Sequence, residues 1–112
     1  MKLINLTPHT LNIFDMSGKQ EIIVLPASGS IARYTDNEKY ISKQKLESVL
    51  IPTYRSIKPG VLYMPKKKDN VIYVVSTPVR IVLKHRKDIA SPGELIRNNE
   101  GQPIGCKGLI FN

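Results

Sequence analysis

The chain has a single cysteine, no tryptophan and only two histidines among its 112 residues. Cys106 has no second thiol to pair with, so neither an internal disulfide nor a zinc site is expected. The histidines, His9 and His85, are too few and too far apart in the sequence for a metal centre. The sequence therefore predicts a protein without a metal and without a cofactor.

Long apolar runs are missing as well. The longest covers residues 71–75, far short of the roughly 18–20 residues that a bilayer span needs. The start of the chain lacks the basic-then-apolar plan of a secretory signal peptide. With 41% apolar and 23% charged residues, the composition is typical of an ordinary globular protein. We therefore expect one cytoplasmic domain over residues 1–112, with no membrane segment.

The familiar catalytic motifs are also absent. Neither the phosphate-binding G-x-x-x-x-G-K-[ST] loop nor the G-x-G-x-x-G dinucleotide fingerprint occurs, which removes support for ATP hydrolysis and nicotinamide redox chemistry. His9, Asp15 and Ser28 could form a triad on paper, but no nucleophile-elbow sequence surrounds Ser28. A G-x-x-G segment at residues 105–108 indicates an RNA-binding KH module only between two helices, and its flanks look extended. We expect no enzymatic activity.

Positive charge is what the sequence has in excess. Seventeen Lys and Arg residues against nine Asp and Glu give a net charge of +8. Residues 1–38 carry a net charge of −1, whereas residues 39–112 carry fourteen basic and five acidic groups, a net charge of +9. A field of this sign attracts nucleotides, nucleic acids and acidic protein surfaces. The alternative is that the lysines serve solubility alone.

The residue pattern predicts about seven or eight short strands with one or two helices. Strands are expected at residues 2–6, 10–15, 21–25, 48–55, 71–75 and 103–111, among others. Residues 21–25 are nearly all apolar, which predicts burial of both faces of that strand. The fold class is α+β, mostly β, with a small antiparallel or mixed sheet rolled toward a barrel or sandwich.

Three segments between these strands have less regular patterns. Residues 38–50 partly fit helical spacing and are predicted as a loop or short helix. A helix is expected over residues 77–86, because Thr77 can cap its first amides and Pro78 suits its first turn; a bent strand is the alternative. Residues 91–93, with the sequence Ser-Pro-Gly, are predicted as a turn.

The candidate ligand-binding residues lie near the predicted ends of strands and at the helix start. Arginines suit phosphate groups because their rigid fork presents paired donors, although each could instead form a surface salt bridge. Turn and helix-start amides would add donors, and His9 and a tyrosine would contact a base or ribose. The predicted site comprises His9, Ser28, Gly29, Arg33, Tyr54, Arg55, Ser76, Thr77, Arg80 and Arg97.

Several short blocks carry a resemblance. They are Asn5-Leu6-Thr7-Pro8-His9, Pro26-Ala27-Ser28-Gly29 with Ala32-Arg33, Pro92-Gly93-Glu94-Leu95-Ile96-Arg97 and Ile104-Gly105-Cys106-Lys107-Gly108. In these blocks the chain resembles a group of short proteins encoded by bacteriophages and prophages, although residues 36–48 match poorly. The resemblance implies the cytoplasm of an infected bacterial host as the setting, and no defined activity.

Three functions are compatible with this setting. The leading hypothesis is a non-enzymatic protein that sequesters an anionic nucleotide-derived signal, a cyclic oligonucleotide or an ADP-ribose-type molecule, and so inhibits host anti-phage defence. The first alternative is a nucleic-acid-binding accessory protein of phage replication or gene control, and the second is a virion or assembly component. Because a 112-residue globule has a radius of gyration of only about 13 Å, we expect a homo-oligomer, most simply a dimer, that shares the site.

Overall fold

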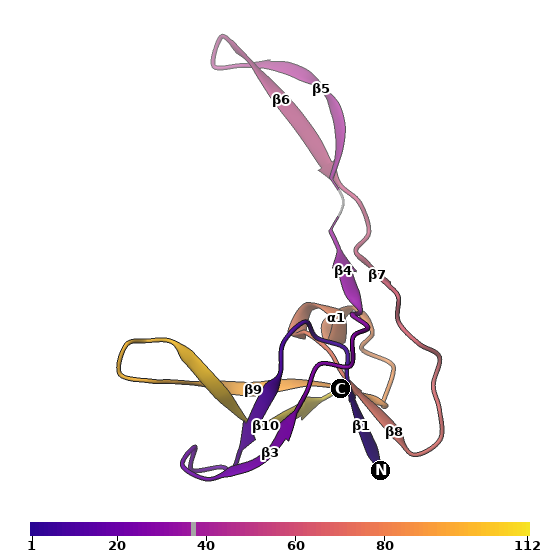
Figure 1. Ribbon diagram of the computed structural model, residues 1–112. Coiled ribbons are helices and arrows are strands. Elements are labelled where there is room, and N and C mark those ends of the chain that lie inside the picture. Colours follow the sequence, from indigo (N-terminus) through magenta and orange to yellow (C-terminus); the bar gives the residue numbers. More distant parts are fainter. Residues whose placement is uncertain (37) are drawn as a thin grey trace.

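The structure, a computed structural model that describes residues 1–36 and 38–112, contains ten strands and one short helix within these ranges (Figure 1). The strands are β1 (Lys2–Asn5), β2 (Leu11–Phe14), β3 (Glu21–Leu25), β4 (Arg33–Thr35), β5 (Glu38–Leu46), β6 (Val49–Ser56), β7 (Gly60–Leu62), β8 (Val71–Val74), β9 (Ile89–Arg97) and β10 (Pro103–Phe111); the helix is α1 (Thr77–Val82). The predicted fold class, mostly β with a short helix, is confirmed.

Six of the strands form one mixed sheet in the order β1-β8-β9-β10-β2-β3. The pairs β1–β8, β8–β9 and β10–β2 are parallel, whereas β9–β10 and β2–β3 are antiparallel. The two edge strands, β1 and β3, approach each other, so the sheet is nearly closed into a barrel. We call this sheet, together with α1, the body of the protein.

The core of the body lies around β8. This strand sits between two parallel neighbours, and residues 72–75 are all buried, as the continuous run of β-branched and aromatic residues requires. Helix α1 packs Val79 into the same cluster, with Leu6, Tyr73 and Ile89. The predicted helix is confirmed but ends at Val82, and its N-cap is Ser76, which makes no side-chain capping bond, instead of Thr77.

A buried asparagine, Asn5, joins the ends of β1 and β3 to the turn that precedes β2. The Asn5 side chain is 1% exposed, and its amide nitrogen donates to the carbonyl oxygens of His9 (2.8 Å) and Leu25 (3.0 Å). Its side-chain oxygen accepts bonds from the amide (2.9 Å) and hydroxyl (2.6 Å) of Thr7. Both donors and both acceptor positions of the amide are therefore used. The Asn5–His9 block is in this respect a structural element of the body.

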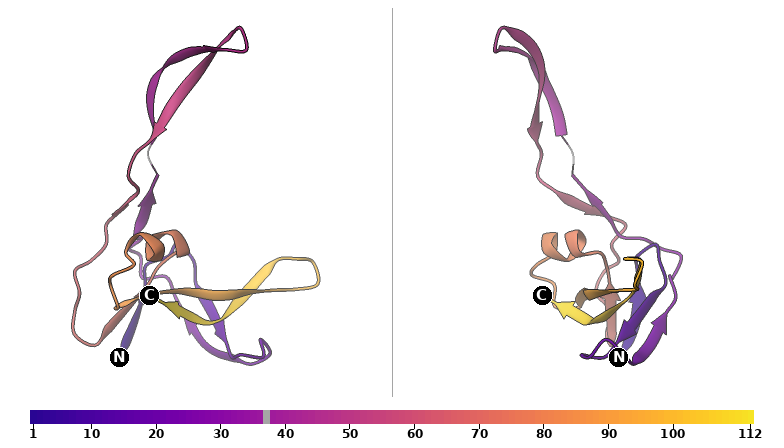
Figure 2. Two further views of the ribbon diagram at one scale, coloured as in Figure 1. Left: turned by 180° about the vertical axis from the view of Figure 1, so that it is seen from behind. Right: turned by 90° about the vertical axis from the view of Figure 1, so that its left-hand side faces the viewer.

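The remaining four strands project from the body. Strands β4 and β7 form one two-stranded ladder, and β5 and β6 form a second one beyond it (Figure 2). The radius of gyration is 18.4 Å and the extents are 58 × 40 × 23 Å, against the radius of about 13 Å expected of a globule of this length. We call the β5–β6 hairpin, residues 38–56, the arm.

The arm corrects the prediction of a loop or short helix over residues 38–50. These residues form β5, the turn and the start of β6, with Leu46 opposite Val49. Glu47 and Ser48 adopt positive φ angles of 51° and 64°, as a two-residue hairpin turn requires. The Glu-Ser pair lacks the usual glycine or asparagine signal for such a turn, so the sequence pattern missed it. The sequence Thr-Asp-Asn-Glu at residues 35–38 also predicts a break after the preceding strand, and Asn37 within it lies outside the described residues.

Two other predictions were wrong. Strand β3 is not covered on both faces: Ile22, Ile23 and Val24 are 64%, 41% and 45% exposed, because β3 is an edge strand. Residues 91–93 are not a turn but part of β9. A side chain at Gly93 would collide with the carbonyl oxygen of Lys107, so this glycine serves close strand packing.

The Asn5 network predicts a large loss of stability on truncation. Asn5→Ala leaves the buried carbonyls and amide without partners and should lower the free energy of unfolding by about 2–4 kcal/mol. Asn99→Ala, at an exposed hairpin position, is the matched control and should change it by less than about 0.5 kcal/mol. Urea denaturation followed by circular dichroism measures both, and equal effects of the two substitutions would contradict the role assigned to Asn5.

Candidate ligand-binding groove

Two adjoining hollows form a groove over the face of β2, β9 and β10. Their cavity volumes are about 430 and 400 Å³, and they share His9, Leu11, Pro92 and Leu95 as lining residues. The first hollow extends to Asn12 and residues 103–106, and the second to Ser76 and Thr77. These volumes lie within the range of small-molecule binding sites, about 300–1,000 Å³.

The groove has its shape because glycines allow its strands to approach closely. A Cβ atom at Gly105 would lie 2.5 Å from the Phe14 ring and 2.6 Å from the carbonyl oxygen of Asn12. Only glycine therefore permits this contact between β10 and β2. At the other end, the Asn5 side chain fixes the backbone of His9 just before β2. A glycine within this strand pattern predicts a bulge or a close backbone contact, and the close contact at Gly105 is confirmed.

The walls of the groove are mainly apolar, with a few hydrogen-bonding groups. Its apolar lining residues are Pro8, Leu11, Pro92, Leu95, Pro103 and Ile104, and its polar ones include Thr7, His9, Thr10, Asn12, Ser76 and Thr77. None of the residues that line the two hollows is Lys, Arg, Asp or Glu. Such a surface can accept a planar ring and orient it by hydrogen bonds. It has no cation with which to neutralise a phosphate.

Cys106 lines the groove but is 2% exposed. Burial raises the pKa of its thiol, so the uncharged form persists at neutral pH. Since the thiolate is the nucleophile, this cysteine is poorly suited to covalent chemistry. Within residues 1–36 and 38–112, no three His, Cys, Asp or Glu side chains group as a metal site would require.

The structure brings three of the ten predicted site residues together. His9, Ser76 and Thr77 line the same hollow. Ser28 and Gly29 lie in an exposed turn, where the Ser28 amide donates to the carbonyl oxygen of Asn5 (3.1 Å) and is not free for a ligand. The apolar wall was not predicted from the sequence, because the partial exposure of Leu11 and Pro92 and the exposure of Leu95 follow only from the strand order.

The four predicted arginines lie on four different elements and do not line the groove. Arg33 is on β4 and Arg55 on β6, next to Tyr54, in the parts that project from the body. Arg97 donates to the carbonyl oxygen of Gly101 (2.9 Å) within its own hairpin. Arg80 donates to the Ser91 hydroxyl (2.7 Å) and to the Asn112 side chain (3.4 Å), which ties α1 to β9 and the C-terminus.

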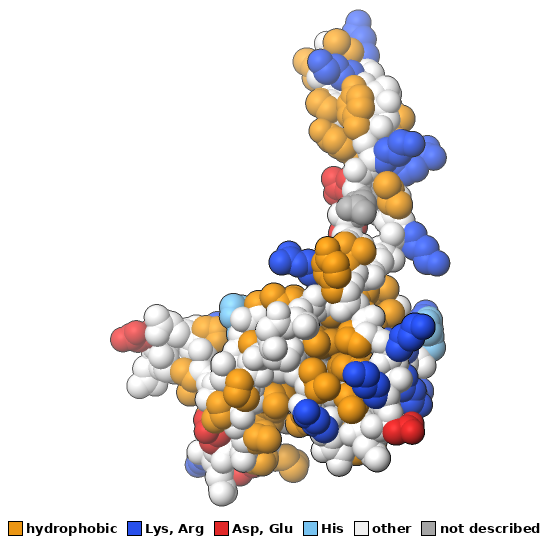
Figure 3. All heavy atoms as spheres, turned by 45° about the vertical axis from the view of Figure 1, so that its right-hand side comes forward, with side chains coloured by type: hydrophobic (Ala, Val, Ile, Leu, Met, Phe, Trp, Pro, Cys, Tyr) orange, Lys and Arg blue, Asp and Glu red, His pale blue; other side chains and the backbone are white. Residues whose placement is uncertain are grey.

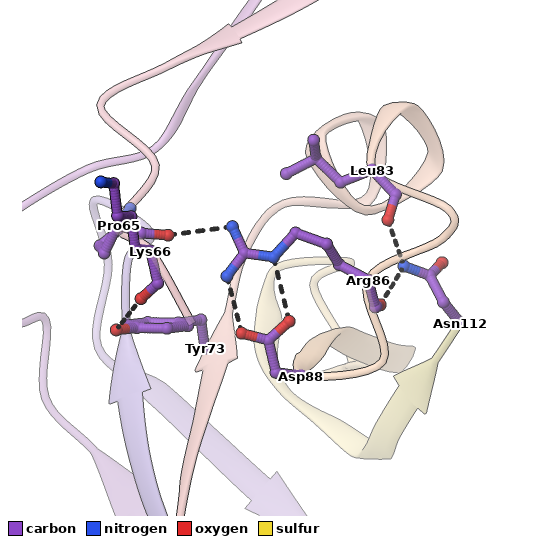
Figure 4. A network of polar contacts seen from close by, with 7 residues as sticks. All are labelled: Pro65, Lys66, Tyr73, Leu83, Arg86, Asp88 and Asn112. Atoms are coloured by element: carbon purple, nitrogen blue, oxygen red, sulfur yellow. Dashed lines mark hydrogen bonds and ion pairs between the residues drawn. The ribbon is translucent and has the colours of Figure 1, made fainter. Parts of the chain in front are cut away.

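A second polar network fixes a lysine-rich loop to the body (Figure 4). Arg86 donates to both carboxylate oxygens of Asp88 (3.0 and 2.7 Å) and to the carbonyl oxygen of Pro65 (2.9 Å). The Tyr73 hydroxyl donates to the carbonyl oxygen of Lys66 (3.2 Å). The network thereby positions Lys67, which borders a smaller hollow of about 170 Å³ together with Lys68 and Lys87.

Comparison of the chain with protein-family models, with curated proteins and with solved structures found no match. In the parts of the chain that the structure describes, no helix is long and apolar enough to cross a membrane. The features that bear on function are therefore the groove, the arm and the distribution of charge.

The Arg86–Asp88 pair predicts an acid-sensitive part of the stability. Hydrogen bonds from Arg86, reinforced by its charge, lower the pKa of Asp88 against the opposing effect of burial. A carboxyl whose pKa is lowered by folding stabilises the native state above its unfolded-state pKa of about 3.9, and that stability is lost as the pH falls through the folded-state pKa. Asp88→Asn should cost about 1.5–3 kcal/mol at pH 7.

Urea denaturation at pH 7 and pH 3 measures this contribution. The difference in unfolding free energy between the native chain and Asp88→Asn should shrink at the lower pH. Asp69→Asn, at an exposed carboxyl in the neighbouring loop, should change stability little at either pH. A difference for Asp88→Asn that stays constant between the two pH values would contradict the assignment.

Proposed function

We propose that the protein is a non-enzymatic binding protein that sequesters an anionic nucleotide-derived ligand, a cyclic oligonucleotide or an ADP-ribose-type molecule. The sequence resembles proteins encoded by bacteriophages and prophages. In an infected host, such a protein would inhibit a defence that signals through this ligand. The observation that carries the proposal is the groove beside β2, whose apolar walls and few polar groups suit a base and its ribose. His9, Ser76 and Thr77 would orient the ligand there by hydrogen bonding.

The phosphates of such a ligand need cations that the groove itself lacks. A single chain carries Lys39, Lys43, Lys45 and Arg55 on the arm, away from the body (Figure 2). A second copy could supply cations to the groove, because a two-fold dimer places a surface of one chain against the other. The proposal is therefore a homo-oligomer, most simply a dimer, in which the groove of one chain binds the base and cations of the other bind the phosphates.

Calorimetric titration tests the binding proposal. We expect one member of a panel of cyclic di- and trinucleotides and cyclic ADP-ribose products to bind with a Kd below about 10 μM, or roughly −7 kcal/mol. Leu95→Trp fills the groove and should weaken that binding at least tenfold. Leu62→Trp is the matched control, since Leu62 on β7 is similarly exposed (48% against 52%) and does not line the groove.

Three results would contradict this proposal: absence of binding across the panel, equal effects of the two tryptophan substitutions, or conversion of the ligand. Chromatography of the ligand released from the complex by heating distinguishes binding from turnover. Recovery of the unchanged molecule is the expected result.

A second candidate function is binding to a nucleic-acid backbone, and the spread of charge favours it. Within the described residues the ion pairs are Arg86–Asp88 and Lys107–Glu94, so most of the seventeen cations have no carboxylate partner. Lys and Arg side chains occur both along the arm and on the side of the body (Figure 3). Over a molecule 58 Å long, this distribution suits an extended polyanion better than a compact one.

The salt dependence of binding decides between the two candidates. If about six phosphates are contacted, raising the salt concentration from 50 to 200 mM should weaken binding to single- or double-stranded DNA or RNA about 10³-fold. Electrophoretic mobility shifts at the two salt concentrations measure this effect. Absent or salt-insensitive binding would exclude the nucleic-acid function.

A further inference from the structure

The arm is the part of the chain with the least contact to the rest. Every described residue of β5 is exposed, as is all of β6 except Thr53. Seven of the exposed residues are large and apolar or aromatic, between 39% and 67% exposed: Tyr40, Ile41, Leu46, Val49, Leu50, Ile51 and Tyr54. An isolated two-stranded hairpin is marginally stable in water, and contiguous exposed apolar surface marks an interaction site. The arm is therefore incomplete on its own.

The total accessible surface gives the size of the surface that a partner would cover. The chain exposes 8,090 Å², whereas a folded monomer of its mass is expected to expose roughly 6,200 Å². The excess, about 1,900 Å² for each chain, exceeds the roughly 800 Å² that each partner buries in a standard interface. If two chains each buried this excess against the other, the total buried area would be typical of a permanent homodimer.

One face of the arm combines apolar and basic side chains. The antiparallel register places Tyr40 opposite Tyr54, Lys43 opposite Pro52 and Lys45 opposite Leu50. Side chains alternate along β6, and a register shift between Tyr40 and Ser42 brings their partners on β5 to the same side. These residues therefore share one face, which we call the basic–apolar face. The two tyrosine rings are in edge-to-face contact, with centroids 5.8 Å apart.

The charge of the arm calls for an acidic partner. Four cations against two carboxylates give residues 38–56 a net charge of +2. On the opposite face, Lys39 is paired with Arg55 across the strands, an arrangement that destabilises a sheet unless an anion neutralises it. Among the described residues, no ion pair relieves any of the four arm cations.

The body carries a surface with apolar and acidic side chains beside the β2–β3 hairpin. A hollow of about 410 Å³ is lined by the apolar side chains of Phe14, Met16 and Ile22 and by Asp15, Glu94 and Lys107. Lys107 lies 3.6 Å from Glu94, so the three charged groups give the hollow a net charge of −1. Met16 and Ile22 are 95% and 64% exposed. We call this surface the acidic hollow. The arm of the same chain points away from the body (Figure 2), so this chain's own arm does not fill it.

We infer that the basic–apolar face of the arm docks into the acidic hollow of a second copy of the chain. Leu50, near the tip, packs against Met16 and Ile22 of the other chain. Lys45 pairs with Glu94, whose carboxylate it shares with Lys107 of that chain. A nine-residue strand spans about 30 Å, long enough to reach across a neighbouring body. Reciprocal docking of two arms closes a two-fold dimer. This inference concerns assembly, uses residues outside the groove and stands whether or not a nucleotide binds.

Multi-angle light scattering over a concentration series tests the inference. The native chain should have about twice the monomer mass of 12.6 kDa at micromolar concentration. Leu50→Glu should raise the dimer dissociation constant at least tenfold. The matched control is Ile81→Glu, on the exposed side of α1 (58% exposed), which should leave the dimer unchanged. Circular dichroism of each variant verifies that the body remains folded.

A charge-reversal pair identifies the docking surface. Lys45→Glu and Glu94→Lys should each weaken the dimer about tenfold, and the double variant should restore it to within about threefold of the native chain. A monomer at all concentrations would overturn the inference. A dimer that tolerates Leu50→Glu would also overturn it, because the dimer would then use another surface. If each single reversal weakened the dimer but the double variant did not restore it, the arm would not dock at Glu94, and the inference would again be wrong. Calorimetry with the nucleotide panel on the same variants tests the separate proposal that cations of the second chain bind the phosphates, which predicts weaker binding by each variant that breaks the dimer.

Discussion

The fold depends on the buried carboxamide of Asn5. A polar group removed from water costs free energy unless its hydrogen bonds are replaced, and here all four are. Through them the end of β1, the end of β3 and the turn before β2 are fixed relative to one another. The two edges of the six-stranded sheet consequently meet at this point, and the groove beside His9 has a rigid border. Packing of apolar residues around β8 stabilises the body, but Asn5 determines where its edges lie.

The body and the arm obey different constraints. The body buries its core, and among the described residues no buried side-chain nitrogen or oxygen lacks a hydrogen-bond partner. The arm instead leaves apolar and basic groups in water, with paired like charges and no core of its own. A groove without cations and an arm without a covering surface each lack what another copy of the chain carries. In the dimer that we propose, a second copy would supply both.

Local patterns predicted much of the fold. Strands at residues 2–6, 10–15 and 103–111 follow from alternation and turn residues, and the fold class follows from their number. Of the arm, β6 was predicted as a strand at residues 48–55, but β5 was missed because the Glu47–Ser48 turn has no local signal. The exposure of β3 depends on its place at the edge of the sheet, which only strand order determines. Three of the arginines lie at or near ends of strands as expected, but Arg80 is in the last turn of α1, and the four lie on four different elements.

We propose above all that a second copy of the chain completes the arm. Hydrogen exchange of the backbone amides, followed by mass spectrometry across a dilution series, tests this claim most directly. We expect residues 38–56 to be protected at high protein concentration and to exchange rapidly on dilution, while β8 stays protected throughout. Exchange in the arm that is equally fast at every concentration would contradict the account.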